Sequence, residues 1–459
     1  MKSFPSQTAL TVVMLAALLA GAHLLFPAVR GAAPGQFVSL VDFPPETTLL
    51  SPLVRHVDPA PPPPAPVVKG VVASALLDDA SPALDHFYAS LWRTGQQQPG
   101  AVTRIVHYGD SPSTADLITG DVRTLLQNRY GDAGHGFVLI AKPWAWYRHN
   151  GVEITASGWS MSRASFSESR DGLFGLGGVS FTGGAGASSS IVYSSPGHTH
   201  FEVWYLKQTG GGALTVTGDG QPLGEVDTNG PDKMPGVAEF DVAAGVHTLE
   251  LRVVRPPVRL FGVVAEKNRP GVVYDTLGLN GASVVVLSQL MNAKHWAAEL
   301  RLRRPDLVVV NYGTNEADFA SYIDHQYEKE LREAIRRIRA ALPETSILIM
   351  SPMDRGHHAG DGIETMPTIP RLVEIQRRVA RETGCGFFDT FHAMGGEGTM
   401  ARWYNARPRL VSADLIHPFP AGGKLIAVVV ERELAAGLNR YKLRQLQTTA
   451  AVRGGKGKH

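Results

Sequence analysis

Apolar strands alternate with long amphipathic helices in two stretches of this chain, and few folds accommodate that order. The expected strands are residues 104–108, 306–312, 346–351 and 386–389. The expected helices are residues 114–129, 322–342, 369–383 and 421–440. Strands that are apolar throughout and separated by helices indicate a parallel sheet covered on both faces. The sequence therefore predicts an α/β domain with a parallel sheet, made of residues 81–150 and 273–441.

The segment between these two stretches, residues 151–272, has a different pattern. Helical periodicity is absent, glycine and serine are frequent, and short segments such as 200–206 and 213–217 alternate polar and apolar residues. Turn signals such as Gly218-Asp-Gly220 separate them. The segment is predicted to be an inserted β-sandwich or jelly roll that interrupts the α/β domain.

The N-terminal segment is predicted to direct the protein out of the cytoplasm. Residues 9–29 are almost entirely apolar. Residues 1–30 form either a signal peptide or an uncleaved membrane anchor, since about 20 apolar residues can span a bilayer. A Pro-rich linker follows at residues 31–80, where consecutive prolines favour an extended spacer. Both interpretations imply a periplasmic or otherwise extracytoplasmic protein, secreted or attached to the inner membrane through residues 9–29.

Charge and composition exclude other classes of function. Lys and Arg number 44 against 42 Asp and Glu, a net charge of +2, so no nucleic-acid partner is expected. The basic tail, residues 442–459, is predicted to be disordered. The single Cys385 can form no intrachain disulfide and lies in an expected buried strand. His357 and His358 adjoin aspartates in a glycine-rich loop, but adjacent histidines rarely ligate one ion together, so we expect no metal and no other cofactor.

Ser111 is the candidate nucleophile. It ends Gly109-Asp-Ser111, directly after an expected strand and before a helix. Its hydroxyl would lie at the carboxyl edge of the sheet and its backbone N–H near a helix N-terminus, where negative charge is stabilised. The same residue types also cap helices, so the tripeptide alone does not distinguish a nucleophile from a cap.

Three further motifs carry candidate partners for this serine. Asp414 and His417 are three residues apart at the entry to the last helix. The carboxylate can accept from one imidazole nitrogen while the other nitrogen faces the serine, which is how a catalytic base is oriented. Asn315 follows a strand and can donate its amide to an oxyanion. Gly281 follows another strand and, having no side chain, can bring its N–H close to a substrate.

Together these motifs resemble the SGNH/GDSL hydrolases in order and spacing, over the α/β sequence on both sides of the insert. The motifs are Gly109-Asp-Ser111, Gly281, Gly313-x-Asn315 and Asp414-x-x-His417. The resemblance implies a flavodoxin-like, three-layer fold. It also implies Ser111 as nucleophile, His417 as base and acid, and Asp414 as the residue that orients His417.

An oxyanion hole is implied as well, formed by the Ser111 N–H, the Gly281 N–H and the Asn315 side chain. Two positions depart from the family pattern. Glu316 stands where Asp is usual, and Asn280 stands where Ser is common. Neither departure removes an oxyanion donor.

The export segment and the insert make the chain most similar to the Ape-type peptidoglycan O-acetylesterases, in which the insert resembles a carbohydrate-binding module. Aromatic residues in the expected insert would stack on sugar rings if one strand face is accessible, but such residues are more often core. They are Phe201, Trp204 and Tyr205. A second aromatic group either lines the cleft or packs under the insert. It comprises Trp144, Trp146 and Tyr147.

The resemblance implies an extracytoplasmic serine esterase that removes O-acetyl groups from a polysaccharide, with peptidoglycan as the expected substrate and an acetyl-serine intermediate. Two alternatives stay open. An O-acetyltransferase acting on an exopolysaccharide would share the acyl-enzyme and differ only in the acceptor. A catalytically silent carbohydrate-binding protein of the envelope would have no need of the paired Asp414 and His417.

Overall fold

The computed structural model describes residues 76–79, 82–167 and 171–455, which belong to one compact unit beginning at Ala73. The predicted leader, residues 1–30, and most of the predicted linker, residues 31–80, lie outside the described ranges. Within those ranges, no helix is both long and apolar enough to cross a membrane.

A six-stranded sheet forms the centre of the α/β part, and five of its strands are parallel. Its strand order is β1 (Leu77–Asp78), β17 (Gly386–Phe388), β14 (Ser346–Met350), β13 (Leu307–Asn311), β2 (Val102–Gly109) and β12 (Gly271–Gly278). Only β1 runs antiparallel to its neighbour. The predicted parallel sheet is therefore confirmed, with all four expected strands in it.

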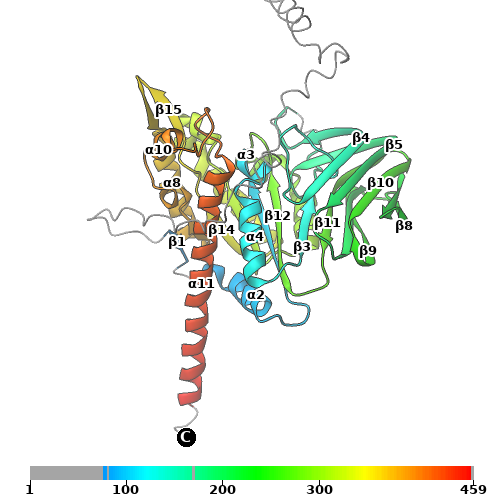
Figure 1. Ribbon diagram of the computed structural model, residues 1–459, viewed down its shortest axis with the longest axis horizontal. Helices are drawn as coiled ribbons and strands as arrows, with labels where there is room; N and C mark the ends of the chain where they lie inside the picture. The colour runs from blue at the N-terminus through cyan, green and yellow to red at the C-terminus, as the bar shows by residue number, and fades with distance from the viewer. Residues whose placement is uncertain (1–75, 80–81, 168–170, 456–459) are drawn as a thin grey trace, which may run out of the picture. The chain divides into compact units, whose positions relative to one another are not determined.

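Helices cover both faces of this sheet. Alternate residues of each strand point to opposite faces, so burying all of them requires a layer of helices on each side. Along β13, Val309 packs with residues of α2 (Asp85–Gly95), α4 (Thr119–Tyr130) and α11 (Pro420–Gly455). Its neighbour Val308 packs with residues of α5 (Ala293–Arg303), α7 (Glu328–Ala341) and α8 (Thr368–Thr383). Figure 1 shows α4 and α11 side by side over the first face. The result is the expected three-layer α/β architecture.

Several helices differ in extent from the prediction. The expected helix 114–129 is divided into α3 (Ser111–Thr114) and α4, because Asp116 between them adopts a left-handed φ of 55°. The side chain of Asp116 accepts hydrogen bonds from Arg123 and from the backbone N–H of Asn150, which stabilise this turn. The shorter helical elements are η3 (Pro82–Leu84), η4 (Val286–Leu290), η5 (Glu316–Asp318), α6 (Ala320–Tyr322), η6 (Ile323–Tyr327), α9 (Thr390–Ala393) and α10 (Thr399–Asn405).

Both ends of the α/β part are longer than predicted. The predicted linker, residues 31–80, includes β1, which pairs with β17, and Asp79 accepts a hydrogen bond from Tyr88. The tail predicted to be disordered from residue 442 continues α11 as far as Gly455. Its Lys, Leu, Arg, Gln and Ala residues are good helix formers. The predicted disorder is therefore wrong for residues 442–455, and residues 456–459 lie outside the described ranges.

A nine-stranded, mainly antiparallel sheet forms the inserted part. Its main strand order is β8 (Gln221–Asp227), β7 (Ala213–Gly218), β10 (Thr248–Arg255), β5 (Val179–Tyr193), β11 (Val258–Glu266), β6 (His198–Lys207) and β9 (Met234–Val246). Two more strands pair at its sides: β4 (Val152–Arg163) with β5, and β3 (Gly134–Val138) with β11. A small hairpin, β15 (Gly356–Ala359) and β16 (Gly362–Thr365), lies apart from both sheets.

The predicted β-sandwich is not confirmed as such, although a large antiparallel sheet is present. One continuous path of hydrogen-bonded strands passes from β5 to β11 through Val258, Arg259 and Leu260. This sheet also begins before residue 151, the predicted boundary, because β3 pairs with β11 and not with the parallel strands.

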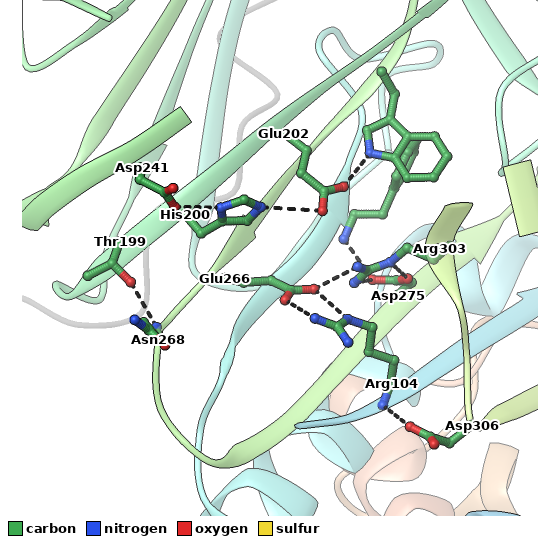
Figure 2. Close-up of polar contacts among 12 residues, drawn as sticks. Arg104, Thr199, His200, Glu202, Asp241, Glu266, Asn268, Asp275, Arg303 and Asp306 are labelled. Atoms are coloured by element: carbon green, nitrogen blue, oxygen red, sulfur yellow. Dashed lines mark hydrogen bonds and ion pairs between the residues drawn. The ribbon is translucent and has the colours of Figure 1, made fainter. Parts of the chain in front are cut away.

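Buried charges join the two sheets (Figure 2). Arg303, at the end of α5, donates to both carboxylate oxygens of Asp275 in β12, at 2.5 and 2.9 Å, and to Glu266 in β11 at 2.6 Å. Arg104 in β2 also donates to Glu266, at 2.6 and 3.0 Å. We call these four residues the Arg303 network. Burial raises the pKa of Glu266, but the two arginines outweigh it and lower that pKa to about 2.

Candidate active site

Ser111 lies where the carboxyl ends of three neighbouring parallel strands meet. The strand β2 ends at Gly109, and the register of the sheet places Gly109 level with Gly278 of β12 and Asn311 of β13. Gly278 has to be glycine, because a Cβ there would lie 2.1 Å from the backbone nitrogen of Thr114 in α3. The end of β12 is thereby in close contact with the single helical turn that Ser111 begins.

Ser111, His417 and Asp414 form one hydrogen-bonded chain. His417 Nε2 is 2.7 Å from Ser111 Oγ, and His417 Nδ1 is 2.7 Å from Asp414 Oδ2. The other carboxylate oxygen of Asp414 accepts from the backbone N–H groups of Ile416 at 2.9 Å and His417 at 3.0 Å, and from the hydroxyl of Ser412. The structure thus brings together three residues that the sequence analysis connected across 306 positions.

The electrostatics of the pair suit a proton acceptor. Its hydrogen bond to Asp414 raises the pKa of His417 above the ordinary 6.5, against the opposing effect of partial burial. Burial favours the neutral form of Asp414, but hydrogen bonds from His417, Ser412 and the backbone hold its pKa well below the usual range. Asp414 is therefore ionised at any working pH and can stabilise a positively charged imidazole.

The two other predicted donors lie on adjoining loops. Gly281 has a φ of 70°, a left-handed conformation that favours glycine, and a Cβ there would meet no atom within 4 Å, so backbone conformation and not space requires it. The side-chain amide of Asn315 donates to the carbonyl of Ala282 at 2.7 Å, next to Gly281. An amide carries two N–H groups, so this bond leaves one for a substrate oxygen. The loop of Gly281 is tied to the nucleophile's strand, since the Leu279 N–H donates to the Gly109 carbonyl at 3.0 Å.

Glu316 connects these two loops, a role that the sequence analysis missed. One of its carboxylate oxygens accepts from the Val284 N–H at 2.9 Å and the other from the Gly313 N–H at 3.0 Å. Glu316 is buried, and burial raises its pKa to about 7 against the hydrogen bonds from those N–H groups. The signal in the sequence was the replacement of the usual Asp by Glu directly after Asn315, since the longer side chain reaches both loops.

Two charged residues near the triad were also outside the prediction of the site. Burial raises the pKa of Asp110 to about 6, although a hydrogen bond from Thr314 and the charge of His417 oppose that rise. Arg355 donates to the Thr314 carbonyl at 2.6 Å and to both oxygens of Asp318 at 2.8 Å. Arg355 thereby holds the loop that carries Asn315.

The aromatic residues of the insert, for which both sugar stacking and core packing were open, are buried. Phe201 and Trp204 are fully buried and Tyr205 nearly so, which contradicts a stacking role, and they pack in the larger hydrophobic core. His107 is buried in β2 with its Nδ1 2.6 Å from the Tyr274 hydroxyl. Among the described residues, no group of three or more His, Cys, Asp or Glu side chains has the geometry to hold a metal ion.

Comparison with known proteins shows that part of the chain is similar to acylhydrolases. Residues 243–425 match the GDSL-like lipase/acylhydrolase family, a range that includes Gly281, Asn315, Asp414 and His417. A solved structure titled "Peptidoglycan O-acetylesterase in action" is 26% identical, with a TM-score of 0.69, over 80% of this chain and 99% of that one.

Two smaller structures match a part of the chain. An acetylxylan esterase from Geobacillus stearothermophilus is 23% identical over 36% of this chain and 73% of its own, with a TM-score of 0.28. A GDSL-like lipase structure from Parabacteroides merdae is 22% identical over 37% of this chain and 74% of its own, with the same TM-score of 0.28. No curated protein matches the sequence.

Proposed function

Because the chain carries a GDSL-like acylhydrolase domain and is a serine esterase of the SGNH type, we propose that it removes O-acetyl groups from an extracytoplasmic polysaccharide, with peptidoglycan as the first candidate. The observation that carries the proposal is the unbroken chain of hydrogen bonds from Ser111 through His417 to Asp414.

In the proposed reaction, Ser111 Oγ attacks the ester carbonyl carbon while His417 Nε2 accepts the hydroxyl proton. Asp414 keeps the imidazole in the orientation that presents Nε2 to the serine and stabilises the imidazolium. The C–O bond to the sugar then breaks, and His417 returns its proton to the leaving alkoxide. Water, deprotonated by His417, hydrolyses the acetyl-serine; acetate leaves and Ser111 regains its proton.

Negative charge develops on the carbonyl oxygen of the ester in both steps. The N–H groups of Ser111 and Gly281 and the free N–H of the Asn315 amide are the proposed donors to that oxygen. Removing one such donor typically costs about 3 kcal/mol of transition-state stabilisation. Glu316 and the Asn315–Ala282 hydrogen bond hold the two loops in place before the substrate binds, so little reorganisation is needed during the reaction.

The choice of substrate is supported by the extent of the similarity to the peptidoglycan O-acetylesterase. It covers nearly all of that chain and 80% of this one, which is more than the α/β part alone. The extracytoplasmic location rests on the apolar residues 9–29 and the Pro-rich stretch after them. An O-acetyltransferase would use the same acyl-enzyme with a sugar hydroxyl in place of water.

Acetate release from O-acetylated peptidoglycan tests the proposal. Ser111→Ala is expected to lower kcat by at least about 10⁴-fold, because the nucleophile is lost while the fold is kept. Ser157→Ala, an exposed serine of β4, is the matched control and should keep the wild-type rate. Equal rates for wild type and Ser111→Ala would refute the serine mechanism.

Two further measurements identify which polysaccharide is deacetylated and whether water or a sugar hydroxyl accepts the acetyl group. Acetylated xylan, alginate and cellulose are assayed beside peptidoglycan, and a higher kcat/KM on any of them would replace peptidoglycan as the substrate. Incubation with a donor ester and an acceptor glycan distinguishes the two reactions. Acetylated glycan as the main product would identify a transferase, and free acetate supports the esterase.

A further inference from the structure

Trp146 is an exposed tryptophan in a connection whose other two aromatic residues, Trp144 and Tyr147, are packed. It lies in the connection between β3 and β4, where its neighbour Tyr147 is buried and Trp144 packs against the larger core. The side chain of Trp146 is 52% exposed. Leaving so much of a large aromatic surface in water forfeits hydrophobic stabilisation, so packing does not explain the residue.

The backbone that follows Trp146 is fixed to the element that carries Ser111. The Arg148 N–H donates to the carbonyl of Thr114 in α3 at 3.2 Å. The Asn150 N–H donates to Asp116, directly after α3, at 2.8 Å. The side chain of Tyr147 is fixed to the residue after β3, since the Leu139 N–H donates to the Tyr147 hydroxyl at 3.2 Å. The segment is therefore held against the turn that begins with Ser111.

The indole itself is fixed to the other side of the candidate site. Its Nε1–H donates to the side-chain carbonyl of Asn280 at 3.3 Å, and Asn280 directly precedes Gly281. Trp146 thus connects the nucleophile's turn with the loop of a proposed oxyanion donor, while half of its surface stays accessible. Asn280 is also one of the two departures from the usual family motif, and this hydrogen bond gives the Asn a specific partner.

We propose that the Trp146 ring is a platform for the sugar of the substrate, binding the apolar face of the pyranose ring that bears the acetyl ester or of the residue next to it. This inference rests on the proposed polysaccharide substrate. An aromatic ring offers a broad apolar surface to a sugar's C–H face. Because the indole is already held by Asn280, little conformational entropy is lost when a sugar binds.

The position favours Trp146 over the aromatic residues of the insert. Phe201 and Trp204 are fully buried and offer no surface to a ligand. Trp146 instead adjoins the loop from which the Gly281 N–H would reach the ester oxygen. A sugar on this ring would present its acetyl group to Ser111, and an ester without a sugar would gain nothing from the contact.

The test compares two substrates in variants at residue 146. For Trp146→Ala, the ratio of kcat/KM for an O-acetylated glycan fragment to that for p-nitrophenyl acetate should fall about tenfold, chiefly through KM, because the stacking contact is lost. Trp146→Phe keeps a flat ring without the Asn280 hydrogen bond and should retain an intermediate ratio. Leu446→Ala, an exposed apolar residue late in α11, is the control and should keep the wild-type ratio.

Each outcome has one meaning. An unchanged ratio in Trp146→Ala would overturn the platform. If kcat/KM falls equally on both substrates, the result points instead to a role of Trp146 in positioning the loop. If Trp146→Phe keeps the wild-type melting temperature, misfolding does not explain its lower ratio. Failure of the proposed function is seen in the wild type, which would then release no acetate from any O-acetylated glycan; failure of this inference is seen only in the variants.

Discussion

Two pairs of charged side chains, one in the candidate active site and one between the two sheets, differ mainly in burial. In the candidate active site, the side chains of Asp414 and His417 are 45% and 39% exposed. In the Arg303 network between the two sheets, the side chains of Arg303 and Asp275 are 1% and 0% exposed. Both regions use short hydrogen bonds to a carboxylate, at 2.7 Å in the first and 2.5 Å in the second.

The difference in burial separates reactivity from stability. A half-exposed pair can take up and release a proton and admit a substrate, and its charges stay solvated when one partner is removed. A fully buried pair leaves an uncompensated charge in a low dielectric when one partner is removed. We therefore expect substitutions in the first region to change the rate and substitutions in the second to change the free energy of unfolding.

The largest effect is expected for Asp414→Asn. The amide presents a donor to His417 and favours the wrong imidazole tautomer, so kcat should fall by about 10⁴-fold. Steady-state acetate release measures the rate, and urea unfolding measures stability, which should change little. A comparable rate in wild type and variant would show that Asp414 does not orient His417.

The pH profile of the same pair gives a second check. His417 must be neutral to accept a proton, and Asp414 raises its pKa above 6.5, so wild-type kcat/KM should decrease as the pH falls through that raised pKa. Asp414→Asn removes the main cause of the rise, and its acidic limb should move to lower pH. A limb that does not move would assign the titration to another group, such as Asp110, whose pKa is about 6.

The next largest effect is expected for Arg303→Met, and it should appear in stability. The substitution leaves Asp275 buried without its cation, which should lower the free energy of unfolding by about 3–5 kcal/mol in urea titration. Arg336→Met is the matched control, because Arg336 pairs with Glu333 on the exposed side of α7 and its loss should change stability little. Equal losses in both variants would mean that burial of the Arg303 network contributes nothing.

The smallest effect is expected for Glu316→Gln, at a residue that shares a property with each region. Glu316 is buried, but it holds active-site loops. An amide retains one acceptor and turns an N–H toward the second backbone donor, so kcat should fall about tenfold with a modest loss of stability. Glu316→Asp keeps both acceptor oxygens on a side chain that is one methylene shorter and no longer reaches both loops, so kcat should fall about as much as in Glu316→Gln. Wild-type activity in both variants would show that Glu316 does not hold the loops.

Local patterns in the sequence were sufficient for the strands of the parallel sheet and for most helices. Runs such as residues 306–312 are apolar on both faces only if both faces are buried, so each run is informative by itself. The candidate catalytic residues Ser111, Asp414 and His417 could be named for a similar reason, because each follows a strand or precedes a helix, and the carboxyl ends of parallel strands meet at one edge. The order of the motifs carried that prediction more than any single residue did.

Features that depend on distant partners were missed. The strand β3 was assigned to the α/β part because its pairing with β11 has no local signal. The two residues of β1 are too short to recognise without β17 beside them. Phe201 and Trp204 were left open between sugar binding and core, since alternation along a strand does not say which face is covered.

Residue order therefore decided the chemistry of this protein, and tertiary packing decided how that chemistry is held. Ser111, Asp414 and His417 are identifiable because side-chain type and position relative to a strand end are properties of the sequence. The roles of Glu316, Trp146 and the Arg303 network are properties of contacts between segments up to 162 residues apart. Such contacts depend on how deeply each residue is buried and on which distant residue lies beside it, and neither can be inferred from the local sequence.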